Sequence, residues 1–453
     1  MARLFSSTRS FLILFAAVLL ALLPAATTPA AAKKLLPVVF VHGHGDTAAL
    51  WIAQIWRFES NGYPRELLYA VDLDHPAARD DNNVAQENRT STTDVASQLA
   101  GFVGRVLIET GADKVVLVGN SRGCQTIRNY VQNGGGAANS ALLFLAGCVH
   151  HGVFNNPGGS LGSEYNGFGD FLSGLNAVNE VVPGLDTITT RSDKFDLFNQ
   201  PMGDFIGFPG TPIGGYYEGP ELRGATNIVL PGVDHRETAY SKAAFAEMFK
   251  AIAGHAPAMT DPVAEENPVL DGEVSGWAAG EATNLPLAGA KVSVYAVDAA
   301  GERMGDAVYT VTVGDDGRWG PFEAKSDQAY EFVVEAGGYP VHHIYRSAFP
   351  RSSHYVNLRP YPLDEAAEGK AAGIHMMRPR GYFGADDTVT FNGGPATGID
   401  DNPVPHVWKV VQTFDSESDE SVVGRFADGA IDESIAAKAW PTDGHVAWIE
   451  LHY

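Results

Sequence analysis

Runs of consecutive apolar residues alternate with amphipathic stretches from Lys34 to about Gly254. The apolar runs predict buried strands at residues 37–41, 66–71, 114–118, 141–146, 186–190 and 226–230. Between these runs, 91–109 and 241–253 have the apolar spacing of helices that bury one face. Strands that are apolar on both faces and alternate with helices are typical of a mostly parallel sheet covered by helices on both sides. The pattern predicts an α/β fold for this part of the chain.

Two long stretches interrupt this alternation, at 152–182 and at 201–222. Both are rich in glycine and in aromatic residues. Irregular segments of such length in a compact domain are usually either functional or disordered. Because their aromatic content argues against disorder, we expect these stretches to form a cap or a substrate groove.

The pattern changes where the last of these helices ends. The α/β domain is expected to span 33–256, and residues 257–268 have the composition of a linker. Beyond the linker, short alternating runs separated by turn residues predict a small antiparallel β-sandwich at 269–363. A polar, alanine-rich break at 364–372 then separates a second C-terminal β-domain at 373–453.

The N-terminus has the features of a targeting segment. Arg3 and Arg9 form a basic region, an apolar stretch follows at 11–23, and small residues fill 25–32. This order predicts a secretory signal peptide at 1–32, and hence a secreted or periplasmic protein. The apolar stretch is short for a membrane span and no later segment is longer, so we expect no integral membrane segment after cleavage. An uncleaved anchor is the alternative.

The charge balance excludes one class of partner. The chain has 31 Lys and Arg residues against 54 Asp and Glu residues, a formal net charge of −23. So large a negative charge repels phosphate backbones and anionic lipid surfaces, so we expect no nucleic acid as a partner. The sequence leaves the oligomeric state open.

The strongest chemical motif is the GNSRG segment at 119–123, which directly follows the apolar run at 114–118. A helical stretch at 124–132 comes after it. A GxSxG segment between a buried strand and a helix is typical of a sharp turn that exposes a nucleophilic serine. Glycine suits the flanking positions because a larger residue would clash across so tight a turn. Ser121 is therefore the candidate nucleophile.

A serine nucleophile requires a base, and the base requires an orienting acid. In parallel-sheet hydrolases these residues follow along the chain in the order Ser, acid, His. His235 lies in the turn after the run at 226–230 and fits the base. Two carboxylates follow the run at 186–190, and we favour Asp196 as the acid over Asp193, whose position suits the capping of a turn.

A third motif, HGHGD at 42–46, follows the first predicted strand. A turn of this kind supplies a backbone N–H group to the oxyanion that develops during acyl transfer, and the residue after the nucleophile supplies the second. These donors are predicted to be the main-chain N–H groups of His44 and Arg122. The side chain of His42 is expected to be structural.

The chain has only two cysteines, Cys124 and Cys148. An exported protein folds in an oxidising compartment, which favours their pairing. Such a disulfide would join the predicted helix after Ser121 to the end of the strand at 141–146. Two unpaired buried thiols are the alternative.

Two clusters of polar residues could be interpreted as metal ligands: His150 with His151, and the segment DLDH at 72–75. Neither has the spacing of a zinc site, and the chain has no C-x-x-C or H-E-x-x-H motif. We therefore expect neither a metal ion nor another cofactor. His150 and His151 are expected to line the substrate pocket instead.

Four segments together resemble those of secreted α/β-hydrolase lipases and carboxylesterases: HGHGD at 42–46, GNSRG at 119–123, SDKFDLFNQP at 192–201 and GVDHRE at 232–237. The similarity is to bacterial and archaeal lipases with C-terminal β-domains, and it covers the chain from about Lys34 to its end. The segments at 317–322 and 378–383 resemble those β-domains.

The resemblance implies an α/β-hydrolase catalytic domain with Ser121 as nucleophile, His235 as base and Asp196 as acid. The chain departs from the family pattern at Asn120 and Arg122, where such lipases often have His and an apolar residue or Gln. A charged Arg122 beside the nucleophile implies a weaker preference for very long, wholly apolar acyl chains.

The sequence thus predicts an exported serine hydrolase that cleaves carboxylic esters through an acyl-enzyme intermediate, with an ester or lipid as substrate. One alternative is a depolymerase of polyesters or other bulky esters that uses the β-domains as anchors. An alternative of another class is a non-catalytic surface-binding protein on the same fold. Turnover measured on both soluble esters and polymer films distinguishes the three.

Overall fold

A computed structural model of the protein describes residues 1, 35–214, 216–362, 369–416 and 420–453. The predicted signal peptide at 1–32 lies outside the described residues, apart from Met1. Within the described ranges, no helix is both long enough and apolar enough to cross a lipid bilayer.

The α/β domain contains one parallel sheet with the strand order β2-β1-β3-β4-β5-β8. Its strands are β1 (Val38–Val41), β2 (Leu68–Val71), β3 (Val115–Asn120), β4 (Ser140–Ala146), β5 (Asp186–Ser192) and β8 (Thr226–Leu230). Each overlaps one of the six apolar runs from which strands are predicted. The α/β prediction is confirmed.

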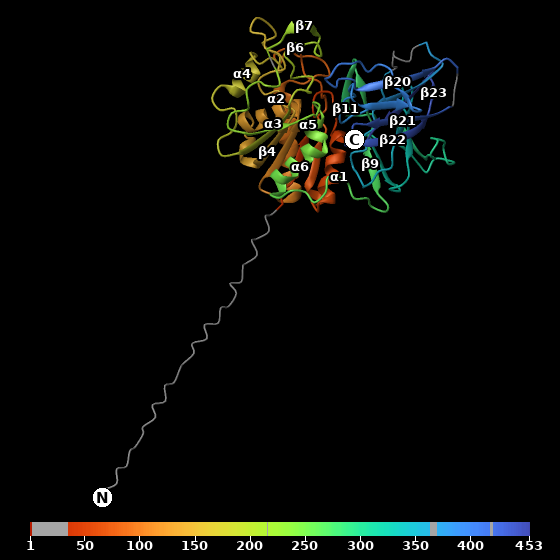
Figure 1. The fold of residues 1–453 in the computed structure, drawn as a ribbon, viewed down its shortest axis with the longest axis horizontal. Coiled ribbons are helices and arrows are strands. Elements are labelled where there is room, and N and C mark those ends of the chain that lie inside the picture. The colour runs from red at the N-terminus through yellow and green to blue at the C-terminus, as the bar shows by residue number, and fades with distance from the viewer. Residues whose placement is uncertain (2–34, 215, 363–368, 417–419) are drawn as a thin grey trace. The chain divides into compact units, whose positions relative to one another are not determined.

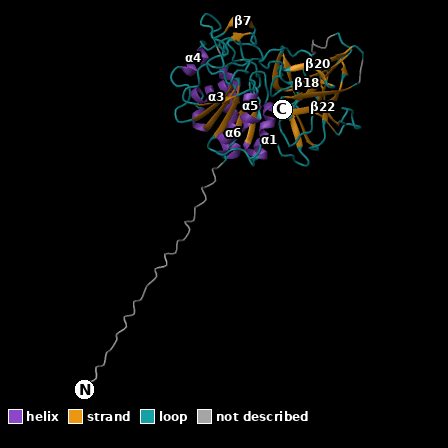
Figure 2. Cartoon of the chain, in the orientation of Figure 1, coloured by secondary structure: helices purple, strands orange, loops and turns teal. Residues whose placement is uncertain are grey.

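Helices cover both faces of this sheet (Figures 1 and 2). They are α1 (Ile52–Ser60), α2 (Thr92–Thr110), α3 (Arg122–Asn133), α4 (Asp170–Asn176), α5 (Glu237–Tyr240) and α6 (Lys242–Ala253), with short 3₁₀ turns at Ala48–Trp51, Arg65–Leu67 and Gly136–Asn139. On one face Phe40 of β1 packs with Phe58 of α1 and Phe245 of α6. On the other, Val41 of β1 packs with Leu99 of α2. Strand β1 thus contributes side chains to the hydrophobic cores on both faces of the sheet.

The described residues beyond 268 are almost entirely strand and turn. Its largest sheet has the order β13-β12-β15-β16-β24-β17-β20, with β23 paired to β17. These strands are β12 (Lys291–Ala296), β13 (Tyr309–Thr312), β15 (Tyr330–Glu335), β16 (Val341–Arg346), β17 (Ala372–Met377), β20 (Lys409–Phe414), β23 (Trp440–Pro441) and β24 (His445–Glu450). A second sheet has the order β19-β18-β21-β22. It contains β18 (Thr388–Phe391), β19 (Gly394–Pro395), β21 (Ser421–Ala427) and β22 (Asp432–Lys438).

Three two-stranded sheets complete the fold: β6 (Met202–Gly203) with β7 (Phe208–Pro212), β9 (Val269–Glu273) with β14 (Arg318–Glu323), and β10 (Ser275–Ala278) with β11 (Glu281–Pro286). Both β6 and β7 lie in the second long irregular stretch predicted from the sequence. The described part of that stretch therefore contains a short hairpin.

The largest sheet differs from the prediction of two successive β-domains. Most of its neighbouring strands are antiparallel, as predicted, but β24 runs parallel to both β16 and β17. Strands from 269–363 and from 373–453 therefore share one sheet, and the break at 364–372 does not separate two independent sheets. Strands so far apart in the chain can pair without any signal in the local pattern of apolar and polar residues, so the sequence does not predict this pairing.

The β-rich region packs directly on the α/β domain. Ile52 and Trp56 of α1 belong to a core that also contains Val292 and Phe332 of the largest β-sheet. The indole N–H of Trp56 donates a hydrogen bond of 3.0 Å to the carbonyl oxygen of Ser352. Helix α1 is therefore buried between two cores.

The predicted linker at 257–268 contains no helix or strand. Its residue Glu265 forms ion pairs with Arg65 of the α/β domain, at 2.7 Å, and with Arg351 of the β-rich region, at 2.9 Å. The linker is thus held by both parts of the protein.

Strand β16 places one histidine where its ionisation controls stability. His342 is fully buried, with Nδ1 2.9 Å from the carbonyl oxygen of Pro340, and its Nε2 accepts the N–H of Tyr361 at 2.8 Å. Burial lowers the pKa of His342 from 6.5 to about 4. As the pH falls from 6.5 towards 4, the unfolded chain binds a proton at this site that the folded chain does not bind, so stability falls with pH.

We expect wild-type protein to lose about 2.5 kcal/mol of unfolding free energy through His342 between pH 7.5 and pH 4.5. His342→Gln removes the titrating ring but keeps an acceptor for Tyr361, and it should show a correspondingly smaller loss. Urea unfolding at the two pH values measures both. The exposed His255, changed to Gln, is the matched control and should behave as wild type. Equal losses in wild type and His342→Gln would contradict the prediction.

Candidate active site

Ser121 occupies a strained turn between β3 and α3. Its backbone has φ +53° and ψ −121°, in a region that non-glycine residues rarely adopt. A β-carbon at Gly119 would lie 2.7 Å from Cδ1 of Ile127, and one at Gly123 would lie 2.4 Å from the carbonyl oxygen of Val41. Only glycine therefore fits on either side of the serine. Strain of about 1–3 kcal/mol at such a residue is typical of functional positions.

His235 and Asp196 form a buried pair in the loops that follow β8 and β5. The Nδ1–H group of His235 donates a 2.8 Å hydrogen bond to Oδ2 of Asp196. The other oxygen of Asp196 accepts the backbone N–H of Phe198, also at 2.8 Å. With Nδ1 as donor, Nε2 is left as the basic nitrogen. It has no hydrogen-bond partner among the described residues.

The competing carboxylate, Asp193, has a different environment. Its Oδ1 accepts backbone N–H groups from Lys194, at 2.8 Å, and from Gly232, at 3.2 Å. It thus joins the turn after β5 to the turn after β8. This geometry is that of a turn cap, and it agrees with the preference for Asp196 as the partner of the histidine.

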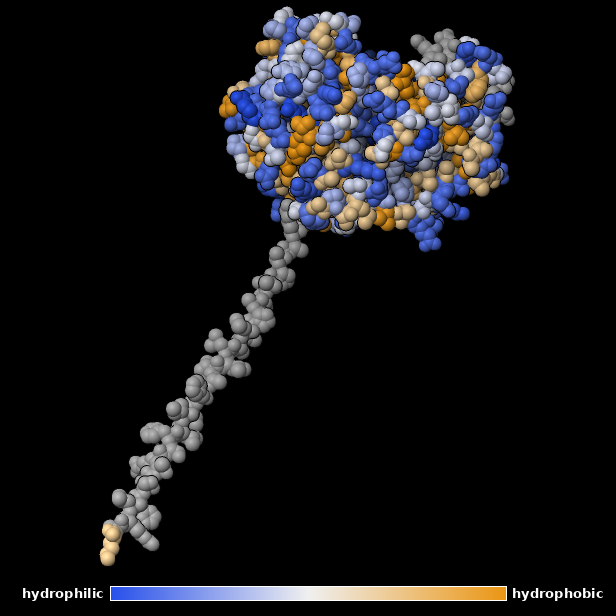
Figure 3. Space-filling view, in the orientation of Figure 1, coloured by the Kyte–Doolittle hydropathy of each residue, from blue (hydrophilic) through white to orange (hydrophobic). Residues whose placement is uncertain are grey.

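The face of the protein drawn in Figure 3 carries no large apolar patch. On the face drawn in Figure 3, apolar residues are scattered in small groups among hydrophilic ones, which is ordinary for a protein surface. The informative apolar surface lies inside a cavity of about 430 Å³ that contains Ser121 and His235.

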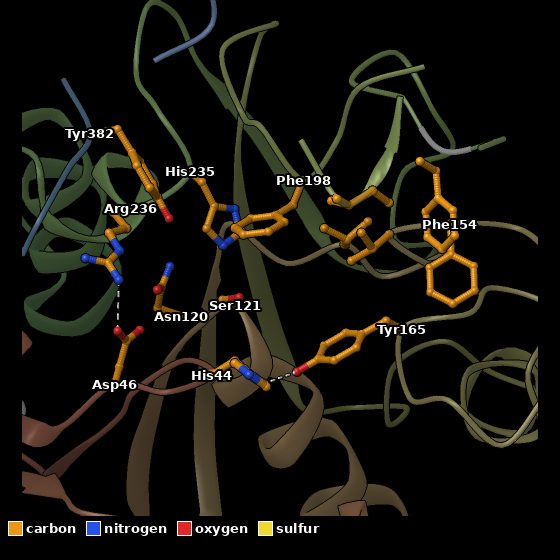
Figure 4. Close-up of a pocket in the computed structure, with 14 residues that line it drawn as sticks. His44, Asp46, Asn120, Ser121, Phe154, Tyr165, Phe198, His235, Arg236 and Tyr382 are labelled. Atoms are coloured by element: carbon orange, nitrogen blue, oxygen red, sulfur yellow. Dashed lines mark hydrogen bonds and ion pairs between the residues drawn. The ribbon is translucent and has the colours of Figure 1, made fainter. Parts of the chain in front are cut away.

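Fourteen residues line this cavity (Figure 4): His44, Asp46, Asn120, Ser121, Val149, Val153, Phe154, Tyr165, Phe198, Ile206, Phe208, His235, Arg236 and Tyr382. Phe154 and Tyr165 come from the first long irregular stretch, and Ile206 and Phe208 come from the second. The two stretches thus form part of a groove at the candidate site, as their aromatic content predicts.

The two residues expected to form the oxyanion hole lie on either side of Ser121. His44 lines the cavity, and its Nδ1 lies 2.8 Å from the hydroxyl oxygen of Tyr165. Arg122 is the first residue of α3, and the first N–H groups of a helix have no acceptor within it. Both positions are compatible with main-chain donation to an oxyanion.

The side chain of Arg122 does not extend into the cavity. It is buried and forms a bidentate ion pair with Glu164, with distances of 2.7 and 3.0 Å. It also donates to Thr90 and to the carbonyl oxygen of Pro76. The sequence suggested that this charge disfavours very long apolar acyl chains. Because the ion pair neutralises the charge away from the cavity, that reason does not apply.

Two further expectations can be compared with the structure. His42 is fully buried, and its Nε2 accepts the N–H of Leu73 at 3.1 Å, consistent with a structural role. His150 and His151 line a separate cavity with Thr189 and Arg191, not the one that holds Ser121. The expectation that they line the substrate pocket is therefore wrong: Val149 just before them lines that cavity, but the ring of His150 hydrogen-bonds to Thr189 and the ring of His151 to Glu180. Among the described residues, no group of three or more His, Cys, Asp or Glu side chains is arranged to hold a metal ion.

The predicted disulfide is present between Cys124 of α3 and Cys148, whose Cα atoms are 5.9 Å apart. Cys148 follows β4, the strand next to β3 in the sheet. The bond therefore fixes the helix after Ser121 to the neighbouring strand end.

Tyr382, from the β-rich region, lines the cavity, although no sequence motif pointed to it. Its backbone N–H donates a 2.6 Å hydrogen bond to Oδ2 of Asp234, the residue before the histidine. From the same segment, Arg378 pairs with Glu237 at 2.5 Å. The segment at 378–383 resembles lipase β-domains, but nothing local in it points to His235.

Comparisons with known proteins agree with these observations. Residues 35–151 match the family model for class 2 lipases, and residues 270–362 match that for the lipase C-terminal domain. No curated protein matches the chain.

Similar solved structures include a lipase from Bacillus licheniformis, BlEst2, and a phospholipase from Legionella pneumophila, PlaB. The mature form of BlEst2 is 20% identical, with 49% of this chain and 93% of that chain covered and a TM-score of 0.35. Its propeptide form is 15% identical, with 90% and 96% covered and a TM-score of 0.36. PlaB is 12% identical, with 72% and 94% covered and a TM-score of 0.34. By its two family matches, the chain combines a class 2 lipase domain, of the α/β-hydrolase fold, with a lipase C-terminal domain.

Proposed function

We propose that the protein is an exported serine esterase or lipase that hydrolyses carboxylic esters through an acyl-enzyme intermediate. One observation carries the proposal: the Asp196–His235 pair leaves the basic Nε2 of His235 without a partner among the described residues, in the cavity that contains Ser121. Figure 4 shows His235 and Ser121 facing the same part of this cavity.

In the proposed first step, Nε2 of His235 takes the proton of the Ser121 hydroxyl as the oxygen attacks the ester carbonyl. The carbonyl oxygen becomes an oxyanion, which accepts the backbone N–H groups of His44 and Arg122. Asp196 stabilises the imidazolium that forms. His235 then gives its proton to the departing alcohol, and the acyl group remains on Ser121.

In the second step a water molecule replaces the alcohol. His235 takes a proton from the water, whose oxygen attacks the acyl carbonyl, and the Ser121 oxygen leaves and regains a proton from the imidazolium. The products are a carboxylic acid and free enzyme. Every proton moved in either step passes through Nε2 of His235.

Export is part of the proposal. The sequence features at 1–32 are those of a signal peptide, and the disulfide between Cys124 and Cys148 suits an oxidising compartment. We accordingly propose a secreted or periplasmic location for the mature chain.

A panel of p-nitrophenyl esters tests the proposal and its acyl preference together. Val149, Val153 and Phe154 give one side of the cavity an apolar wall, and each buried CH₂ group contributes about 0.8 kcal/mol. We expect kcat/KM to rise by up to about fourfold per added CH₂ from acetate onwards, until the cavity is full. Stopped-flow absorbance should also show a burst of p-nitrophenol, because we expect these activated esters to acylate Ser121 faster than water releases the acyl group.

Two outcomes would contradict these expectations. A chain that binds the esters without turnover would support the alternative of a non-catalytic surface-binding protein. Turnover confined to polymer films, with none on the soluble esters, would support the depolymerase alternative.

A further inference from the structure

The cavity around Ser121 has two chemically different sides. In Figure 4, Phe154 lies to one side of Ser121 and His235, whereas Asp46, Arg236 and Tyr382 lie to the other. The ring of Phe208 is 6.3 Å from that of Phe154, so it belongs to the apolar side. An ester whose carbonyl carbon is at Ser121 must place its acyl chain on one side and its alcohol on the other. The apolar side suits the acyl chain, which leaves the polar side for the alcohol.

Tyr382 is fixed on the polar side by the residues that flank His235. Its backbone N–H is held by Asp234 at 2.6 Å, and its ring lies 5.3 Å from the guanidinium group of Arg236. Arg378, itself paired with Glu237, donates to the carbonyl oxygen of Tyr382 at 3.0 Å. Residues that precede and follow His235 in the sequence therefore hold Tyr382 in place.

The hydroxyl group of Tyr382 is available to a ligand. It extends into the cavity beside Arg236 and His235 (Figure 4) and has no hydrogen-bond partner among the described residues. The side-chain oxygen of Asn120, on the same side, is buried and is likewise unpartnered within the described part of the chain. The hydroxyl donor of Tyr382 thus faces the space assigned to the alcohol, with the buried amide oxygen of Asn120 behind this side of the cavity.

The charges on this side cancel. Arg236 and Asp46 form an ion pair at 3.0 Å, and Arg236 also donates to the carbonyl oxygen of Pro379 at 2.6 Å. Because the positive charge of the guanidinium group is already neutralised by Asp46, it attracts an anion only weakly. The polar side therefore favours an uncharged ligand that can form hydrogen bonds. A second cavity of about 290 Å³ shares Asp46 and Arg236 with the first, and it provides room beyond the ester bond.

We propose that the polar side, with Tyr382 from the β-rich region, binds the alcohol part of the substrate, and that the preferred substrates are monoesters of uncharged alcohols that carry further hydroxyl groups. This inference rests on the proposed ester hydrolysis. Tyr382 is on this view a residue of the substrate site, although it lies in the other domain. Triesters, whose remaining alcohol oxygens are acylated, cannot donate hydrogen bonds to this side.

The experiment compares four octanoyl esters in the same detergent micelles, with the full mature chain: 1-monooctanoylglycerol, methyl octanoate, trioctanoylglycerol and octanoyl glycerol 3-phosphate. We expect the glycerol monoester to have the highest kcat/KM of the four. A neutral hydrogen bond is worth about 0.5–1.5 kcal/mol. In Tyr382→Phe the ratio of kcat/KM for the glycerol monoester to that for the methyl ester should therefore fall by about threefold to tenfold.

Tyr295→Phe is the matched control, because it removes a tyrosine hydroxyl from β12 in the same region without touching the cavity. It should leave the ratio at the wild-type value. A wild-type ratio near one, an unchanged ratio in Tyr382→Phe, or a preference for the triester or the phosphate ester would overturn the inference. Failure of wild type to hydrolyse any of the four esters would instead overturn the proposed function.

Discussion

Ser121→Ala is expected to lower kcat for ester hydrolysis on the order of 10⁶-fold, because no other group can accept the acyl chain in the first step. Removal of the nucleophile from a serine triad leaves only the modest catalysis that comes from binding and from the oxyanion donors. Alanine retains the β-carbon, so the strained backbone at φ +53° is the same in wild type and variant. The folded structure should therefore persist.

The measurements are the steady-state rate on p-nitrophenyl octanoate and the thermal unfolding midpoint. Ser173, an exposed serine in α4, provides the matched control when changed to alanine, and it should retain wild-type activity. Intact protein mass after mixing with ester should show an added acyl group in wild type and none in Ser121→Ala. Turnover in Ser121→Ala close to the wild-type rate would remove the basis of the proposed mechanism.

Asp196→Asn is expected to lower kcat by about 10⁴-fold, the loss typical of a triad acid replaced by its amide. An asparagine NH₂ group in place of Oδ2 would favour the wrong tautomer of His235, with the proton on Nε2. That nitrogen could then no longer accept the proton of Ser121. The loss should appear in kcat for every ester tested, since the acid acts on the histidine and not on the substrate.

Asp193→Asn distinguishes the two carboxylates. Its Oδ1 receives backbone N–H groups of Lys194 and Gly232, and an amide oxygen can accept the same bonds. We therefore expect a change in kcat of less than about tenfold, because Asp196, and not Asp193, is hydrogen-bonded to the ring of His235 and stabilises its imidazolium form. A larger loss in Asp193→Asn than in Asp196→Asn would reverse the assignment of the acid.

The difference between these two residues illustrates how far sequence reasoning could go. Both are carboxylates that follow β5 within four positions. Their spacing in the sequence can favour one of them as the acid but cannot decide between them. Their roles diverge because the backbone after Ser192 turns and directs one side chain to the β8 turn and the other to the ring of His235. That direction depends on the path of two loops relative to each other, which no local pattern encodes.

Other parts of the site were predictable because their causes are local. The six strands follow from apolar runs, and the turn at Ser121 follows from two glycines whose β-carbons would collide with Ile127 and Val41. The disulfide could be anticipated because the chain has only two cysteines and its N-terminal segment predicts export to an oxidising compartment. By contrast, the expectation that His150 and His151 line the pocket was wrong, since position after a strand does not fix the direction in which each side chain points.

The sequence by itself determined the parallel α/β sheet, the turn that carries Ser121 and the β-rich character of the C-terminal region. These depend on hydrophobic periodicity and on backbone sterics, which act between residues that are close along the chain. Only the tertiary structure decided that β24 joins strands of both predicted β-domains, that Asp196 meets His235, and that Tyr382 completes the cavity. Each of these is a contact between distant segments, and its geometry is set by how whole sheets and loops pack against one another.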